Sequence, residues 1–279
     1  MSYKFGEIFK KVASEKKNHL SERKLLKNIR KGFENQEFKM YLQFIVDSKE
    51  GKISSAETLS RWVNSSGEVV FPGTYIGIME KSGLITRFDY YMFEKVCQKL
   101  SEWKDSELSD VALSCNLTRI TISEKDFVHR IKEIAEKYDF DRKKLLIEIT
   151  EDSLEKNLVT AMYNIIKVKE LGFRIALDDI GSGYTSFVSL CEYPIDVIKL
   201  DREILLLTGT EKGKKLFKGL VSLAHNLNLT VVCEGVETEE QNNMVSNSDC
   251  DYIQGWYYTK ALPENKAEAF ARGYMNKFI

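Results

Sequence analysis

Histidine and cysteine are scarce in this chain of 279 residues, which contains three histidines and five cysteines. No two cysteines have C-x-x-C spacing, their number is odd, and Cys115 and Cys233 lie inside apolar runs. We therefore expect reduced, buried thiols and a cytoplasmic location. The histidines, His19, His129 and His225, are scattered over segments with a helical pattern. This composition argues against a zinc site and against Ser–His nucleophilic chemistry.

Long apolar runs and a strong net charge are also lacking. No run approaches the roughly 20 residues that cross a membrane, and the basic N-terminus lacks the apolar core of a signal peptide. The net charge of -1 gives no reason to expect a nucleic acid polymer as partner. The charge is uneven, however, because residues 1–32 carry ten basic and three acidic residues, a net charge of +7.

The basic N-terminal segment shows apolar residues at helical spacing among its charges, which predicts a helix over residues 4–33. We favour a solvated helix packed beside the main domain, or a linker to an N-terminal sensor or partner domain. A basic helix on a membrane surface is the less favoured alternative. The sequence thus divides into an N-terminal basic helix or linker, residues 1–33, and a main domain, residues 34–279.

The main domain begins with two strand-like runs, Phe38–Asp47 and Ile53–Ser60, whose short connection predicts an antiparallel hairpin. Helical patterns follow near Pro72–Lys81 and Thr86–Lys104. From there, strand patterns alternate with helical stripes, which indicates parallel βαβ units. These six strands are predicted at Val111–Leu117, Leu145–Thr150, Phe173–Asp178, Val197–Leu200, Leu229–Glu234 and Asp251–Trp256. With 43% hydrophobic residues and about eight strands, the sequence predicts the α/β class and a closed TIM-like (β/α)8 barrel.

The stretch Arg174–Phe187 places two adjacent carboxylates, Asp178 and Asp179, where a buried strand ends and a turn with Gly181 and Gly183 begins. At such an end, two consecutive side chains can converge on one point. Their like charges then repel unless a cation lies between them, and a hard divalent ion is the natural candidate. The alternative is that one Asp caps the next helix and the other is exposed in the turn.

Oxygen-bearing side chains occur at nearly every predicted strand end, where barrel enzymes keep their chemistry. In chain order they are Glu57, Asn116, Glu148, Asp178, Asp179, Asp201, Glu234 and Gln254, with Glu151 and Glu237 just beyond two of them. Carboxylates and an amide, without thiolate or imidazole, favour Mg²⁺ or Mn²⁺. Two such ions sharing a carboxylate suit the attack of water on a phosphodiester. Arg61 and Lys199 fit a phosphate clamp and a helper for that water; the alternatives are a surface ion pair and a buried partner of the acids.

Several motifs together resemble the EAL domain, the cyclic di-GMP phosphodiesterase family. The matching stretches lie within about residues 25–265 and include A-E-T-L-S-R-W, C-N-L-T, I-E-I-T-E, L-D-D-I-G-S-G-Y-T-S, D-V-I-K-L-D, C-E-G-V-E-T-E-E-Q and C-D-Y-I-Q-G-W. The resemblance implies a barrel whose first strand runs antiparallel to the others. It also implies a homodimer formed through the loop region after Asp179.

The same resemblance implies roles for individual residues. Two divalent cations, Mg²⁺ or Mn²⁺, would be bound by Glu57, Asn116, Glu148, Asp178, Asp179 and Glu234. Catalysis would involve Lys199, which holds the attacking water, together with Glu234, the nearby Asp201, and Glu151, which anchors the loop after Asp179. The dinucleotide would contact Gln43, Leu59, Arg61 and Gln254.

Four positions depart from the family pattern: Phe44, Thr58, Ile180 and Ser182 stand where proline, alanine, phenylalanine and threonine are usual. None of them removes a ligand, so they bear on substrate affinity and loop-coupled regulation more than on catalysis. The sequence predicts hydrolysis of cyclic di-GMP to linear pGpG. One alternative is a non-catalytic cyclic di-GMP receptor that signals through the N-terminal helix. Another is a barrel enzyme that acts on a different phosphodiester.

Overall fold

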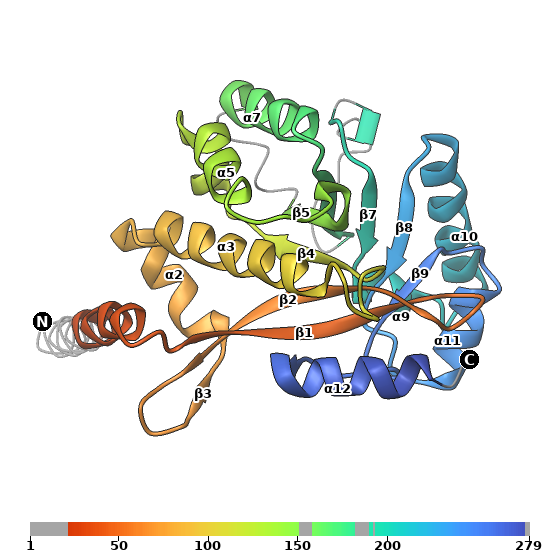
Figure 1. Ribbon diagram of the computed structural model, residues 1–279. Helices are drawn as coiled ribbons and strands as arrows, with labels where there is room; N and C mark the ends of the chain where they lie inside the picture. The colour runs from red at the N-terminus through yellow and green to blue at the C-terminus, as the bar shows by residue number, and fades with distance from the viewer. Residues whose placement is uncertain (1–21, 151–157, 182–189, 192, 277–279) are drawn as a thin grey trace, which may run out of the picture. The chain divides into compact units, whose positions relative to one another are not determined.

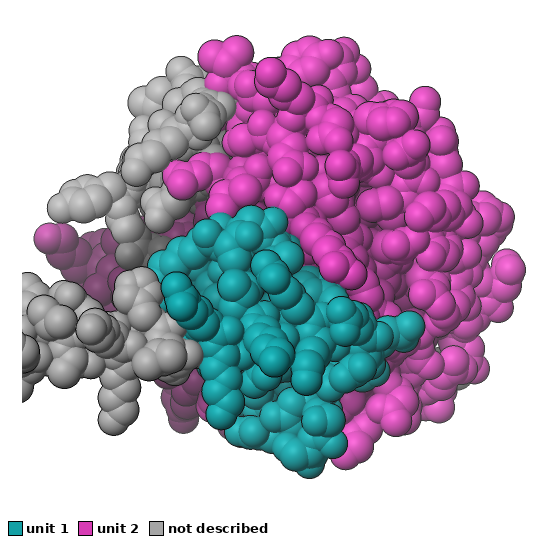
Figure 2. Space-filling model, turned by 90° about the vertical axis from the view of Figure 1, so that its left-hand side faces the viewer, with its two compact units in different colours: residues 1–39, 60–85 teal, residues 40–59, 86–279 magenta. Residues whose placement is uncertain are grey.

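The computed structural model of the protein describes residues 22–150, 158–181, 190–191 and 193–276. None of the helices in these ranges combines the length and the apolar character needed to cross a membrane. The chain forms two compact units, coloured separately in Figure 2. The smaller unit comprises residues 1–39 and 60–85, and the larger comprises residues 40–59 and 86–279. The division into residues 1–33 and 34–279 stays a prediction.

The smaller unit packs around aromatic side chains. Its regular elements are helical residues 22–34, the two-residue strand β3 (Val69–Val70), which pairs with the end of β2 (Ile53–Val63), and helix α2 (Pro72–Ser82). The ring of Phe38 lies 5.7 Å from that of Trp62 and 5.5 Å from that of Tyr75, measured between centroids. Proline occupies the first turn of α2, as the sequence predicts. The expected N-terminal helix is thus present where the chain is described.

The larger unit contains a closed barrel of eight strands (Figure 1). Besides β2, its strands are β1 (Phe38–Asp47), β4 (Ala112–Asn116), β5 (Leu145–Thr150), β6 (Arg174–Ile180), β7 (Val197–Leu200), β8 (Thr230–Cys233) and β9 (Tyr252–Gln254). Their order is β1–β9–β8–β7–β6–β5–β4–β2, and pairing of β2 with β1 closes the ring. Strand β1 runs antiparallel to β9, while the pairs from β2 and β4 round to β8 and β9 are parallel. The predicted TIM-like barrel with an antiparallel first strand is confirmed.

Helices lie outside the strands of the larger unit (Figure 1). They are α3 (Ile85–Trp103), α4 (Arg119–Ile122), α5 (Phe127–Ala135), α7 (Leu158–Glu170), α9 (Arg202–Leu207), α10 (Glu211–Asn226), α11 (Glu239–Ser246) and α12 (Glu264–Met275), with a 3-10 turn η1 (Arg142–Lys144) and a short strand β10 (Leu262–Pro263) beside β1. Helix α5 buries an apolar stripe of Phe127, Ile131 and Ala135. Helix α12 lies along β1, where the ring of Phe270 stacks on Phe44 at 5.7 Å between centroids.

The barrel interior is arranged in layers because alternate residues of each strand face inward. Five apolar side chains form one buried layer: Ile45, Leu146, Ala176, Val197 and Val232. Two residues further along β5, β6, β7 and β8 come Glu148, Asp178, Lys199 and Glu234. The next inward-facing layer, at the carboxyl ends of the strands, is therefore ionisable, and the apolar layer forms its floor.

Candidate metal centre and active site

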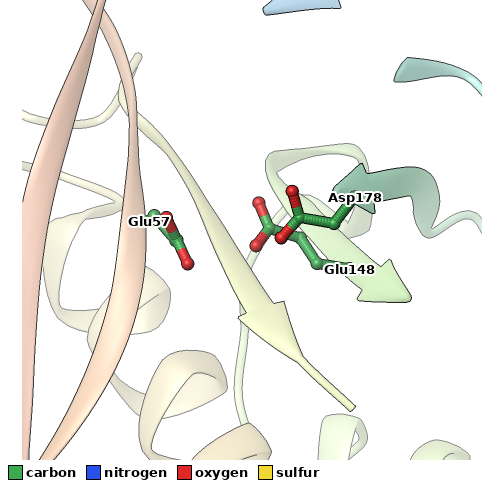
Figure 3. A group of neighbouring side chains, drawn as sticks. All are labelled: Glu57, Glu148 and Asp178. Atoms are coloured by element: carbon green, nitrogen blue, oxygen red, sulfur yellow. The ribbon is translucent and has the colours of Figure 1, made fainter. Parts of the chain in front are cut away.

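Carboxylates from several strands converge at the carboxyl end of the barrel. Oxygen atoms of Glu57, Glu148 and Asp178 lie within 4.8 Å of one another, and so do oxygen atoms of Asp178, Asp179 and Glu234. Figure 3 shows Glu148 and Asp178 side by side, with Glu57 facing them from β2. The two groups share Asp178. Five of the predicted acids therefore lie close together, and their role as metal ligands stays a prediction.

A bulge in β6 brings the two adjacent aspartates to the same side. Leu177 pairs with Ile198 and Ile180 with Leu200, so β6 has one residue more than β7 between these pairs. Asp179 adopts a left-handed φ of 61°, and its N–H donates to Asp178 Oδ1 over 2.9 Å. A bulge with a left-handed residue bends the strand locally and redirects a side chain. Both carboxylates therefore reach Glu234, which regular alternation in a strand would forbid.

Lys199 is the buried cation among these acids, with 1% of its side chain exposed. Its Nζ lies 2.7 Å from Glu234 Oε1, 3.2 Å from Asp178 Oδ2, 3.3 Å from Glu148 Oε2 and 3.5 Å from Glu57 Oε2. Burial by itself would lower the pKa of Lys199, but the surrounding carboxylates raise it well above its ordinary value. One ammonium faces four carboxylates, so the cluster carries excess negative charge whenever the acids are ionised.

The excess charge appears in the acids themselves. Burial raises the pKa of Glu148 well above its ordinary value, although Lys199 opposes the shift. Burial likewise raises the pKa of Glu234 to about 8, against the effect of Lys199. The pKa of Asp179 is raised by desolvation and then by the charge of Asp178. Without a further cation, ionising these carboxyls costs more free energy than in water, and an added positive charge would lower that cost.

Glu57 differs because two amides hold its ionised form. Asn116 Nδ2 donates to Oε1 over 2.9 Å, and Gln254 Nε2 donates to Oε2 over 2.6 Å. Burial would raise the pKa of Glu57, but Lys199 and these hydrogen bonds together lower it. The Oε1 atom of Gln254 is buried and has no hydrogen-bond partner among the described residues. An orphaned amide oxygen beside a set of carboxylates fits hard divalent cations, which prefer oxygen ligands.

Two other residues from the predicted set lie in the larger unit with partners of their own. Asp201 caps α9 by accepting from Glu203 N–H over 2.7 Å, and its charge helps to raise the pKa of Asp179. Gln43 donates from Nε2 to the carbonyl oxygen of Thr259 over 3.2 Å. Asp201 therefore lies near the aspartate pair, whereas the expected contact of Gln43 with a dinucleotide stays a prediction.

Three predicted residues remain, Leu59, Arg61 and Glu151. Leu59 is half-buried at the end of the larger unit's part of β2. Arg61 belongs to the smaller unit, where its guanidinium lies 4.8 Å from the ring centroid of Phe71. Glu151 lies outside the described residues. The roles of these three residues stay predictions.

Ser114 is a polar residue of the barrel interior that the motif-based reading of the sequence did not select. It is 2% exposed, pairs in register with Glu57, and lies two residues before Asn116 on the same face of β4. The spacing of two from Asn116 was the signal that could have found it. The unusual Thr58 lies on the opposite face of β2 from Glu57, and its Oγ1 donates to the carbonyl oxygen of Ser114 over 2.5 Å.

The family model described as EAL domain matches residues 26–261, which is most of the chain. This chain belongs to the EAL domain family. Among curated proteins, this EAL domain is 29% identical over 243 residues to Signaling protein YkoW of Bacillus subtilis, covering 87% of the chain and 30% of that protein. It is 25% identical over 247 residues to Cyclic di-GMP phosphodiesterase NbdA of Pseudomonas aeruginosa, covering 88% of the chain and 32% of that protein.

Solved structures agree with the fold of this EAL domain. The PaMucR phosphodiesterase in its c-di-GMP complex superposes with a TM-score of 0.82 at 24% identity, covering 88% of this chain and 99% of that one. The EAL domain described here spans roughly a third of the length of the curated relatives that it matches. The similarity therefore concerns one domain of each relative.

Proposed function

We propose that this chain hydrolyses cyclic di-GMP to linear pGpG at a centre that holds two divalent cations, Mg²⁺ or Mn²⁺. The observation that carries the proposal is the convergence of carboxylates from β2, β5, β6 and the end of β8 on one buried ammonium. Membership of a family whose relatives include named cyclic di-GMP phosphodiesterases supports the choice of substrate.

The charge of the cluster supports a pair of cations. The acids form two groups of three that overlap at Asp178, so each group would offer three carboxylates to one ion, with Asp178 common to both groups. The proposed ligands are Glu57, Asn116, Glu148, Asp178, Asp179 and Glu234. Burial and the neighbouring acids raise the pKa of Glu148, Glu234 and Asp179, and Lys199 balances only one of the negative charges, so two divalent ions would favour the ionised carboxylates.

Such ions, when bound, supply Lewis-acid activation of the phosphoryl group and of the attacking water. The chain's own residues do the rest of the proposed work. Lys199 holds the attacking water and stabilises negative charge that develops in the transition state. Arg61 clamps a phosphate with its planar pair of donors, and Gln43, Leu59 and Gln254 contact the dinucleotide. Asp201 acts beside Asp179, and Glu151 anchors the loop that follows it.

The test is incubation of the purified chain with cyclic di-GMP and Mg²⁺ or Mn²⁺, followed by chromatography for pGpG. We expect product with either ion, none with EDTA, and binding without turnover in Ca²⁺, whose longer bonds and higher coordination number misplace the water. Tight binding without product in every divalent ion would establish the receptor alternative. Hydrolysis of bis(p-nitrophenyl) phosphate but not of cyclic di-GMP would point to another phosphodiester.

We further propose that the chain works as a homodimer in the cytoplasm and that its N-terminal segment couples it to a sensor or partner domain. These proposals rest on the family resemblance and on the +7 charge of residues 1–32. Light scattering coupled to size-exclusion chromatography tests the dimer, and a monomer at micromolar concentration would refute it.

A further inference from the structure

A small cavity lies inside the barrel of the larger unit, on the side of the acidic cluster that faces the amino ends of the strands. Its volume is about 50 Å³. Glu148, Lys199 and Ser114 line its inner end, and all three are at most 2% exposed. Arg174 and Tyr252, the first residues of β6 and β9, line its outer end and are half-buried. The cavity therefore reaches from the back of the candidate metal centre toward the opposite mouth of the barrel.

The size of this cavity and the polar groups at its two ends suit water, while its middle passes through the apolar layer of Ile45, Leu146, Ala176, Val197 and Val232. One water needs roughly 10–15 Å³ of such volume, so the space holds about three waters and no larger organic ligand. Polar cavities with several hydrogen-bonding groups hold ordered water, whereas apolar cavities of this size stay dry. Ala176, which pairs in register with Glu148, leaves room beside that carboxylate because its side chain is a single methyl group.

Ser114 carries a buried hydroxyl beside this cavity. Its Oγ is buried and makes no hydrogen bond with any described residue. The hydroxyl and the Glu148 carboxylate line the same small cavity. The two groups are therefore neighbours whose geometry falls short of a direct hydrogen bond. A buried hydroxyl without a partner is costly, and a water in the adjoining cavity would satisfy it while also reaching Glu148.

We propose that the cavity holds ordered water that joins Ser114 Oγ to the buried sides of Glu148 and Lys199, and that Ser114 is thereby a positioning residue of the metal centre. The water fixes the orientation of the Glu148 carboxylate from behind, while the opposite side faces the cation. Loss of a group that orients a metal ligand by hydrogen bonding weakens metal affinity by about 10–100-fold. The positioning role rests on the proposed function, since it presumes that Glu148 binds a cation. The hydration of the cavity does not.

The test compares Mn²⁺ affinity, measured by calorimetry, in the wild type, Ser114→Ala and Ser123→Ala. Ser123 is the matched control, because its Oγ is also buried without a partner among the described residues but does not line the cavity. We expect Ser114→Ala to weaken Mn²⁺ binding at least fivefold and Ser123→Ala to leave it within twofold. If Ser114→Ala does not fold, Ser114→Cys keeps the shape of the side chain with a somewhat larger terminal atom and removes most of the hydrogen-bonding capacity.

The melting temperature of Ser114→Ala in EDTA, compared with that of the wild type, is an independent readout. Its change differs between a cavity that holds water and one that is empty. Loss of a hydroxyl that water satisfies leaves the melting temperature of Ser114→Ala equal to or below that of the wild type. Loss of an unsatisfied hydroxyl raises it. A raised melting temperature, or Mn²⁺ affinity within twofold of the wild type, overturns the proposal. Neither Mn²⁺ affinity nor melting temperature depends on turnover. A wild type that binds Mn²⁺ but forms no pGpG therefore refutes the proposed function and leaves this inference standing.

Discussion

Replacing Lys199 with methionine removes the ammonium on which four carboxylates depend. Methionine keeps most of the length of the side chain and none of its charge. Lys199 is 1% exposed, and its contacts with Glu57, Glu148, Asp178 and Glu234 span 2.7 to 3.5 Å. Removal of one partner from a buried ion cluster costs about 3–5 kcal/mol, because the remaining charge has neither water nor counter-charge. We expect the ion-free variant to lose stability by that amount at pH 8.

The loss should be smaller at pH 5. The pKa of Lys199 is raised above its unfolded value, so its stabilising contribution is complete at both pH values and is lost only in strongly alkaline solution. The difference between pH 5 and pH 8 therefore comes from the acids. Glu148 and Glu234 already have raised pKa values in the presence of Lys199, and removing the ammonium raises them further. At pH 5 they are neutralised by protons, whereas at pH 8 protonation costs about 1.4 kcal/mol for each pH unit above the unfolded pKa.

Urea unfolding in EDTA at both pH values, followed by tryptophan fluorescence, measures the two losses. Lys215→Met on the exposed face of α10 is the matched control and should change stability by less than about 0.5 kcal/mol. Saturating Mn²⁺ should narrow the gap between Lys199→Met and the wild type, because the ion supplies the missing positive charge. A gap below about 1 kcal/mol at pH 8, or a gap equal at both pH values, would refute this account of the cluster.

Four more outcomes are expected. Glu57→Gln should abolish pGpG formation and weaken Mn²⁺ binding, because it removes the charge of a ligand that two amides hold in place. The circular dichroism spectrum should be unchanged. Turnover at the wild-type rate would refute the role of Glu57 as a metal ligand. In EDTA, the free energy of unfolding should fall by a few kcal/mol as pH rises from about 4.5 to about 8. The raised pKa of Glu234 makes the folded state bind more protons than the unfolded state over this range. A melting temperature that rises between these pH values contradicts a raised pKa for Glu234. Asp179→Gly should stabilise the ion-free protein by about 1 kcal/mol, because glycine tolerates a φ of 61°. The same variant should bind Mn²⁺ more weakly, and an unchanged affinity would show that Asp179 is not a ligand. Arg61→Ala should weaken cyclic di-GMP binding in Ca²⁺ by about 1.5–3 kcal/mol, measured by calorimetry, and an unaltered affinity would show that Arg61 is no phosphate clamp.

The sequence alone determined the barrel and most of the candidate centre. Period-two patterns and helical stripes show which face of each element is buried, because the order of apolar and polar residues along the chain marks that face. The predicted bounds of β1, β5 and β7 agree with the structure for that reason. Because parallel strands end at one edge of a barrel, the position of a carboxylate at a strand end sufficed to place Glu57, Glu148 and Asp178 near one another.

Only the tertiary structure decided how these acids are balanced. The sequence left Lys199 either as a helper for water or as a partner of neighbouring acids. Its distances to four carboxylates follow from the position of β7, which lies between β6 and β8 and shares the barrel interior with β2 and β5. The bulge that turns Asp179 toward Glu234 depends on the register between β6 and β7, which no local pattern specifies. The cavity behind Ser114 exists because side chains from all eight barrel strands leave space between them, and packing of that kind is a property of the assembled barrel.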